Sequence, residues 1–168
     1  MKSYIIEKEW INNNLKCIVV FQKGGHRCGY VEVPQTHPLF GKIYTEYLNK
    51  STNIEIKDFF KVHGGITFSG EFSEYSTTTK NWWFGFDCAH WNDKQDFDLA
   101  EKYFPEEKAL YSILKNTSTI FTSEKNCSIK TLNYVVEQCE SLAKQLIDYE
   151  NSIQNINTNT IKGEINND

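Results

Sequence analysis

The chain has 168 residues, a formal net charge of −4 and an aromatic content of 14%. This length suits a single domain with its own hydrophobic core. The negative charge excludes a global field that would attract genomic nucleic acid or an anionic membrane surface, although a local anion site stays open. No apolar run approaches the length of a membrane span. We therefore expect neither genomic nucleic acid nor a membrane as a partner.

The N-terminus and the cysteines predict a reducing compartment. The first ten residues carry charges throughout, which argues against a signal peptide. The five cysteines are odd in number and include no CxxC pair. They are therefore expected to be reduced thiols in a cytoplasm, where their simplest role is that of small buried apolar side chains.

The first 34 residues predict a β-meander. Segments 3–10 and 15–22 are apolar enough to be strands, and the sequence INNN between them is typical of a turn. Gly24 and Gly25 predict a second turn, which leads into a strand at 28–34. The strand at 15–22 is apolar on both faces, so we expect it near the centre of a sheet.

The rest of the chain predicts one hairpin and several helices. Residues 66–69 alternate apolar and polar side chains, and their expected partner strand is NWWFGFD, joined to them by EYSTTTK. Pro105 separates two segments with helical spacing. From Ser128 to about Tyr149, apolar residues fall on one stripe, which predicts an amphipathic helix capped by Ser128 and packed on the sheet.

These elements predict the α+β class: an antiparallel, meander-like sheet packed against a long C-terminal amphipathic helix. Residues 1–150 are expected to form a single domain. The remaining residues, 151–168, are rich in Asn and poor in large apolar side chains, so we expect a disordered tail.

Three Gly–His clusters are the candidates for chemistry: GGHRCGY with THPLFGK, then HGGITFSG, and then GFDCAHWND. Glycine lets the backbone approach a ligand or adopt a positive φ, but it also marks ordinary tight turns. If the loop after Phe86 leaves its strand, the side chains of Asp87, His90 and Asp93 can converge with that of His63. The candidate metal ligands are His63, Asp87, His90 and Asp93, and the candidate catalytic residues are His63, His90 and Asp87.

Two explanations of that convergence stay open. Imidazole nitrogens and carboxylate oxygens are suitable ligands for a divalent metal, which is the one cofactor the sequence suggests. The spacing matches no standard zinc signature, however, and an Asp–His hydrogen bond that fixes a loop explains the residues equally well.

A nucleotide pocket is a further hypothesis. Arg27 is the only arginine, and with Lys42 it could contact phosphate, while a tryptophan stacks on a base. Backbone N–H groups beside His63 could bind a phosphate oxygen. The alternative is that the tryptophans pack in the core. The candidate ligand-binding residues are Arg27, His26, Lys42, His63, Gly64, Gly65, Thr67, Trp82, Trp83, Asp87 and His90.

The sequence resembles a widespread family of small phage and prophage proteins. The resemblance covers about residues 24–147, through HRCGYVEVPQTHPLFGK, the block HGGxTxSG, the block WWFGFDCAHxxD, and TLNYVVEQCESLAKQL. It carries no assigned activity and no catalytic residue. It implies a setting, because small phage proteins of this kind resemble anti-defence factors that act in the host cytoplasm, some of which sequester or degrade nucleotide-derived immune signals.

Three functions follow as hypotheses. The leading one is immune evasion by a binding protein, a sponge that sequesters a cyclic nucleotide or an ADP-ribose derivative. The second is a hydrolase or phosphodiesterase that degrades such a nucleotide with His63, His90 and Asp87, with or without a metal. The third is a protein–protein inhibitor of a host factor. Each is compatible with a homo-oligomer.

Overall fold

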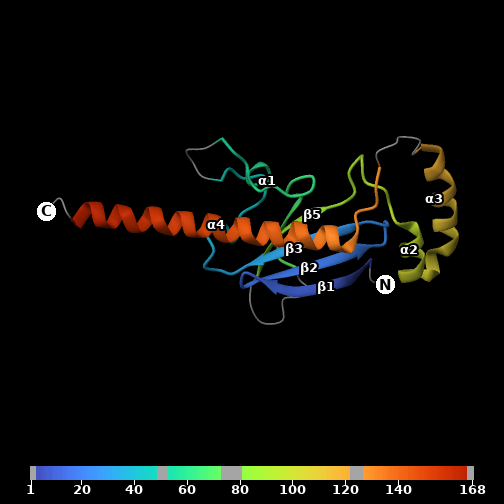
Figure 1. Cartoon of the computed structure of the whole chain (residues 1–168), viewed down its shortest axis with the longest axis horizontal. Coiled ribbons are helices and arrows are strands. Elements are labelled where there is room, and N and C mark those ends of the chain that lie inside the picture. Colours follow the sequence, from blue (N-terminus) through green and yellow to red (C-terminus); the bar gives the residue numbers. More distant parts are fainter. Residues whose placement is uncertain (1–2, 49–52, 73–80, 122–126, 166–168) are drawn as a thin grey trace.

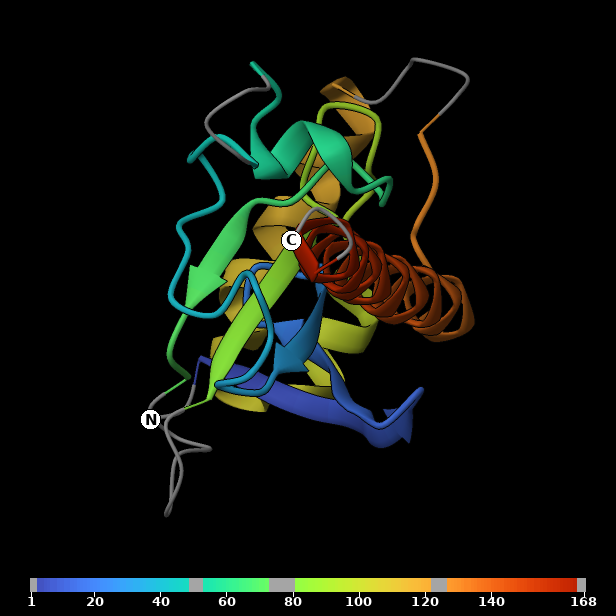
Figure 2. The same ribbon diagram turned by 90° about the vertical axis from the view of Figure 1, so that its left-hand side faces the viewer.

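A five-stranded antiparallel sheet with the strand order β1-β2-β3-β5-β4 forms the centre of the molecule (Figure 1). The computed structural model describes residues 3–48, 53–72, 81–121 and 127–165, with the backbone alone for 118–121 and 157–165. A long helix crosses one face of the sheet (Figure 2). The predicted α+β class is therefore confirmed. The strands are β1 (Tyr4–Asn12), β2 (Leu15–Gln22), β3 (Arg27–Val33), β4 (Phe68–Gly70) and β5 (Trp82–Asp87).

The predicted turns and pairings are present. Asn13 and Asn14 have φ values of 49° and 63°, which produces a two-residue hairpin between β1 and β2. Asparagine tolerates this left-handed conformation better than most residues do. β4 pairs with β5, as the alternation at 66–69 predicts. The expected connection EYSTTTK lies outside the described residues.

Helix α4 (Leu132–Ile165) differs from its prediction at both ends. Its N-terminus is capped by Thr131, whose Oγ1 accepts a hydrogen bond from the Tyr134 N–H at 3.3 Å. Ser128 is not the cap, because it forms a β-bridge with Asp93 instead. At the other end, the helix continues from Tyr149 through most of the segment expected to be a disordered tail. No proline interrupts that segment.

α4 packs on the face of the sheet that carries Cys17, Val19, Val31, Phe84 and Phe86. Gly29 on β3 permits this close approach of the helix, because a Cβ on Gly29 would lie 2.5 Å from Sγ of Cys139 on α4. None of the helices in the described ranges is both long and apolar enough to cross a membrane. The buried residues of the helix face are Val135, Val136, Cys139, Leu142, Ala143 and Leu146.

Shorter helices close the remaining sides. α2 (Phe97–Tyr103), the 3-10 turn η1 (Pro105–Glu107) and α3 (Lys108–Phe121) cover the end of the sheet near Phe21. Pro105 separates α2 from α3, as predicted. α1 (Ile56–Phe59) lies in the chain between β3 and β4. The second face of the sheet buries Ile18, Val20, Cys28, Tyr30 and Trp83.

All five cysteines are free thiols, and four are buried. Burial raises the pKa of Cys17 and Cys88 to about 12 and that of Cys28 to about 11, and it also raises the pKa of Cys139. Because the thiolate is the reactive form, we expect iodoacetamide to alkylate only the half-exposed Cys127 in the folded protein. Peptide mass spectrometry measures this, and labelling of a buried cysteine before unfolding would contradict it.

Candidate functional site

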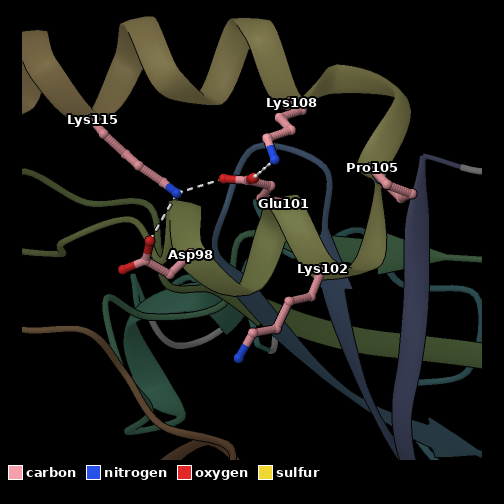
Figure 3. Close-up of a pocket in the computed structure, with 6 residues that line it drawn as sticks. All are labelled: Asp98, Glu101, Lys102, Pro105, Lys108 and Lys115. Atoms are coloured by element: carbon pink, nitrogen blue, oxygen red, sulfur yellow. Dashed lines mark hydrogen bonds and ion pairs between the residues drawn. The ribbon is translucent and has the colours of Figure 1, made fainter.

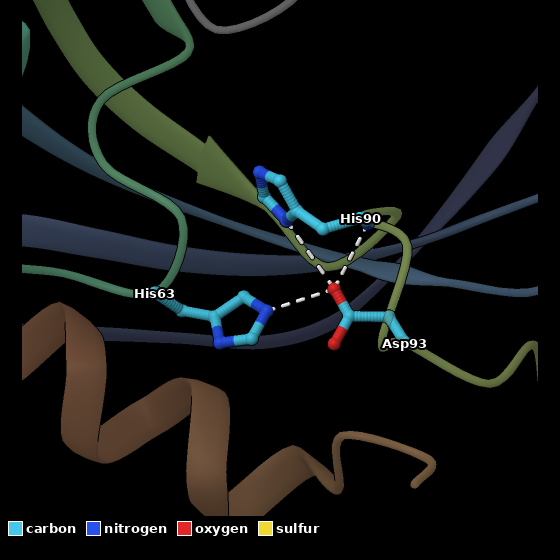
Figure 4. Close-up of side chains that lie close together, drawn as sticks. All are labelled: His63, His90 and Asp93. Carbon is cyan, nitrogen blue, oxygen red and sulfur yellow. Dashed lines mark hydrogen bonds and ion pairs between the residues drawn. The ribbon is translucent and has the colours of Figure 1, made fainter. Parts of the chain in front are cut away.

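Two histidines and one aspartate from two loops, one carrying His63 and the other His90 and Asp93, meet beside the first turns of α4 (Figure 4). His63 Nε2 lies 2.8 Å from Asp93 Oδ2, and His90 Nδ1 lies 3.3 Å from the same oxygen. The two imidazole rings are 5.3 Å apart, edge to face. The predicted convergence of His63, His90 and Asp93 is therefore present, and we call these three residues the His–Asp–His cluster.

Backbone contacts hold the loop that carries His90 and Asp93. The Asp93 N–H donates to the His90 carbonyl at 2.9 Å, which closes a tight turn directly after β5. The Lys94 N–H donates to the Ser128 carbonyl at 3.1 Å, so the segment before α4 braces the same loop. The position of His90 relative to Asp93 is thus set locally.

His63 is fixed by α4. Its backbone N–H donates to Gln138 Oε1 at 2.9 Å, and its ring Nδ1 lies 3.0 Å from the Tyr134 hydroxyl. In the neutral ring, Nε2–H donates to the Asp93 carboxylate and Nδ1 accepts from the tyrosine. If the proton moves to Nδ1, the tyrosine oxygen accepts it, so the same contact holds the ring with Nε2 unprotonated.

Asp93 is the buried centre of the cluster, with only 5% of the residue exposed. Its Oδ2 accepts hydrogen bonds from both rings and from the His90 N–H at 3.0 Å. Burial by itself raises the pKa of a carboxyl group, but the hydrogen bonds from His63 and His90 outweigh it and hold the pKa of Asp93 below its ordinary value. Asp93 Oδ1 has no hydrogen-bond partner, although Lys130 Nζ lies 3.5 Å away.

Asp87 is peripheral to the cluster. Its Oδ1 accepts the Ala89 N–H at 3.0 Å, an ordinary turn contact, and lies 3.8 Å from His90 Nδ1. The carboxylate shared by the two histidines is Asp93, which the sequence suggests as a metal ligand but not as a catalytic residue.

Arg27 is not placed as a phosphate ligand, because the guanidinium is buried and fully engaged. Its Nε and Nη2 donate to the two carboxylate oxygens of Glu7 at 2.6 and 3.0 Å, and Nη1 donates to the Lys130 carbonyl at 2.9 Å. The only arginine of the chain is therefore a structural residue that ties β1, β3 and the segment before α4 together.

The two histidines of the first Gly–His cluster are not members of the His–Asp–His cluster, although Asp87 and Asp93 are close enough to His26 to oppose the effect of burial on its pKa. His26 is half-buried in the turn before β3, and burial lowers its pKa. His37 is buried, accepts the Leu39 N–H at 3.1 Å and bonds to the Leu146 carbonyl at 3.1 Å. It fastens the loop after β3 to α4.

The predicted stacking and phosphate groups lie at the far end of β5. Trp82 begins this strand and Asp87 ends it, so five residue steps of about 3.3 Å separate them. Trp82 Nε1 donates to the Lys42 carbonyl at 2.9 Å, while Trp83 is buried on the second face of the sheet. Thr67 is exposed and donates its N–H to Gly85. The structure does not bring these groups to the cluster.

Three residues at the cluster are absent from the sequence prediction: Lys130, Tyr134 and Gln138. They belong to the segment whose apolar stripe predicts a covering helix. Tyr134 and Gln138 are four residues apart and therefore share one side of α4. A polar pair at this spacing beside the apolar stripe is the signal that could have found them.

A separate hollow lies elsewhere, between α2 and α3 (Figure 3). It encloses about 600 Å³ and is lined by Asp98, Glu101, Lys102, Pro105, Lys108 and Lys115. Lys115 pairs with Asp98 at 2.8 Å and with Glu101 at 2.7 Å. These partners satisfy one another, and we assign this hollow no ligand.

Gly64 allows the His90 ring to occupy its position. A Cβ on Gly64 would lie 2.0 Å from Cε1 of His90. We therefore expect Gly64→Ala to push the ring away from Asp93, measured as a change in the His90 ring signals in ¹H–¹⁵N NMR spectra. Gly65→Ala is the matched control, since Gly65 has a similar φ of +85° but its Cβ would meet only the Lys57 carbonyl at 3.2 Å. Equal changes in both variants would identify backbone strain, not the ring contact, as the cause.

Comparison of the chain with protein-family models, with characterised proteins and with solved structures finds no match, so its similarity to other proteins adds nothing to the geometry described above.

Proposed function

We propose that the protein is a hydrolase that cleaves a phosphate ester or anhydride bond in a nucleotide-derived small molecule at the His–Asp–His cluster. The observation that carries this proposal is the sharing of one buried carboxylate by two imidazoles, one of which opens to solvent. The His90 side chain is 36% exposed, whereas that of Asp93 is 1% exposed. A reacting molecule can therefore reach the cluster from the His90 side.

The cluster contains the groups that hydrolysis requires. Cleavage of a P–O bond needs an activated water and a proton for the leaving oxygen. Of two neighbouring imidazoles, one can accept a proton from the water and the other can donate a proton to the leaving oxygen. Around a divalent cation, the same side chains could instead hold a metal that activates a bound water. Without a metal, Asp93, whose pKa is lowered, acts as a carboxylate that orients the rings; with a metal, the same carboxylate would be one of its ligands.

The surroundings of the cluster favour an anionic substrate with an aromatic base. Lys130 Nζ lies 3.5 Å from Asp93 Oδ1 and 2.9 Å from Ser128 Oγ, which places a cation beside the histidines. Trp91 directly follows His90 and is 80% exposed. An exposed indole is a stacking surface for a nucleobase, so Trp91 takes the role that the sequence analysis gives to Trp82 and Trp83.

The resemblance to small phage proteins supplies the biological setting of this proposal. A hydrolase of nucleotide-derived immune signals would be an anti-defence enzyme acting in the host cytoplasm. Capture of the same molecule without cleavage stays a prediction, as does inhibition of a host protein. Cleavage is favoured over capture because Arg27 and Trp83 are buried in structural roles and Lys42 lies at the other end of β5.

The test is incubation of the protein with cyclic dinucleotides and ADP-ribose derivatives, followed by denaturation and chromatography. We expect a new product from one of these compounds and a loss of rate of 100-fold or more in His90→Gln. Lys42→Gln is the control and should keep the full rate, since Lys42 is exposed and paired with Glu46. Recovery of intact ligand bound to the protein would reject hydrolysis in favour of capture.

A further inference from the structure

We propose that the His–Asp–His cluster binds a divalent transition-metal ion of the zinc class. One nitrogen of each ring and one carboxylate oxygen lie within 4.8 Å of one another. This inference goes beyond the proposed function, because metal binding needs neither a substrate nor turnover.

Two of the three distances between the donor atoms suit such an ion, and the third, between the two ring nitrogens, is within 4.8 Å. Bonds of about 2.0–2.1 Å in a tetrahedral arrangement place neighbouring ligand atoms about 3.3 Å apart. His90 Nδ1 and Asp93 Oδ2 are already separated by 3.3 Å. His63 Nε2 lies 2.8 Å from the same oxygen, so this pair needs to open by only about 0.5 Å to admit the ion.

Each donor is held by a neighbour that would persist with a metal bound. The Tyr134 oxygen can accept the Nδ1–H of His63, which leaves Nε2 unprotonated and aimed at the site. The His90 ring packs against Gly64, and the turn from His90 to Asp93 is closed by a backbone hydrogen bond of 2.9 Å. A preorganised donor set loses little conformational freedom when it binds an ion.

The buried carboxylate gives an independent reason to expect a cation. Only 5% of Asp93 is exposed, and its Oδ1 lacks a hydrogen bond. Burial of a charged oxygen without full pairing is costly. Among the described residues, Lys130 Nζ pairs with Oδ1, but at 3.5 Å it compensates this oxygen only partly and leaves Oδ2 to the histidines.

The ligand types select the class of ion. Two imidazoles and one carboxylate suit zinc, cobalt, manganese or iron(II), whereas calcium and magnesium prefer oxygen ligands throughout. Three protein ligands leave a coordination position open, which is the arrangement of catalytic zinc sites. The open position would face the exposed side of His90, where a water or a substrate oxygen can enter.

The experiment is two titrations of the chelator-treated full chain. Binding of Co²⁺ is monitored by optical absorption, and binding of Zn²⁺ is measured by calorimetry. We expect one equivalent of each metal to bind and His90→Gln to weaken binding by 100-fold or more. Asp87→Asn is the matched carboxylate control and should bind metal as the wild type does. Loss of binding in that variant would overturn the assigned ligand set.

Lys130→Gln tests the same site with the opposite expected effect, an increase in metal affinity. Removal of a positive charge next to Asp93 should strengthen metal binding by about tenfold, which is equivalent to about 1.4 kcal/mol. Thermal unfolding of each variant monitors the fold. The proposal would be overturned if the wild type bound no stoichiometric metal, or if His90→Gln and Lys130→Gln both left the affinity unchanged.

These outcomes are distinct from failure of the hydrolase proposal. Stoichiometric metal binding without turnover of any tested compound keeps the metal site and rejects the hydrolase for those compounds. Turnover by metal-free protein that binds no stoichiometric metal in the titration keeps the hydrolase and rejects the metal site.

Discussion

Replacement of Arg27 by Met should lower the free energy of unfolding by about 3–5 kcal/mol, because it leaves a buried carboxylate without its partner. The side chains of Arg27 and Glu7 are 8% and 4% exposed, and two hydrogen bonds join them. In the variant, the Tyr103 hydroxyl, 3.2 Å from Glu7 Oε1, still donates to this carboxylate but carries no positive charge. Urea denaturation measures the change.

The double variant Arg27→Met, Glu7→Leu is the control for this prediction. With both charges removed, no buried ion is left unpaired, so its loss of stability should be smaller than that of Arg27→Met alone. A double variant that is less stable than both single variants would contradict this account.

Asp93→Asn should reduce hydrolysis and metal binding by 100-fold or more and should also change the response of stability to acid. Because the folded-state pKa of Asp93 lies below its ordinary value of 3.8, the carboxylate stabilises the fold above that value. This contribution is lost as the pH falls through the folded-state pKa. Urea denaturation at a series of pH values below about 5 should therefore show a steeper loss of stability for the wild type than for Asp93→Asn.

The matched control for the acid response is Asp87→Asn. Asp87 is half-exposed, and its contact with the cluster is a long one, 3.8 Å from Oδ1 to His90 Nδ1. This substitution should therefore leave the pH dependence of the stability as it is in the wild type. If Asp93→Asn and the wild type lost stability in parallel as the pH falls, the hydrogen bonds to Asp93 would not be the cause of its acid sensitivity.

Much of the fold is predictable because its local signals agree. The strand at 15–22 is apolar on both faces and lies inside the sheet, and Asn13 and Asn14 adopt the turn that their residue type favours. The apolar stripe of α4 likewise predicts the face that meets the sheet. The end of this helix is less predictable, since the composition after Tyr149 gives neither an apolar stripe nor a proline to stop it.

The candidate site is predictable only in part. Glycines and polar residues directly after an apolar strand identify His63, His90 and Asp93 as neighbours. Strand periodicity assigns Trp82 and Trp83 to opposite faces, but it does not show that both lie at the wrong end of β5 for this site. Nor does the sequence show that Glu7 forms an ion pair with Arg27, since that pair depends on how β1 and β3 are placed in the sheet.

The participation of α4 has a consequence for the newly made chain. Tyr134 and Gln138 hold His63, and both belong to the last helix of the molecule. A ribosome that has synthesised the chain as far as Asp93 has therefore produced every member of the His–Asp–His cluster, but not yet the helix that holds His63 in place. The proposed activity would begin only when the first turns of α4 dock, so a chain that lacks Tyr134 and Gln138 should be inert.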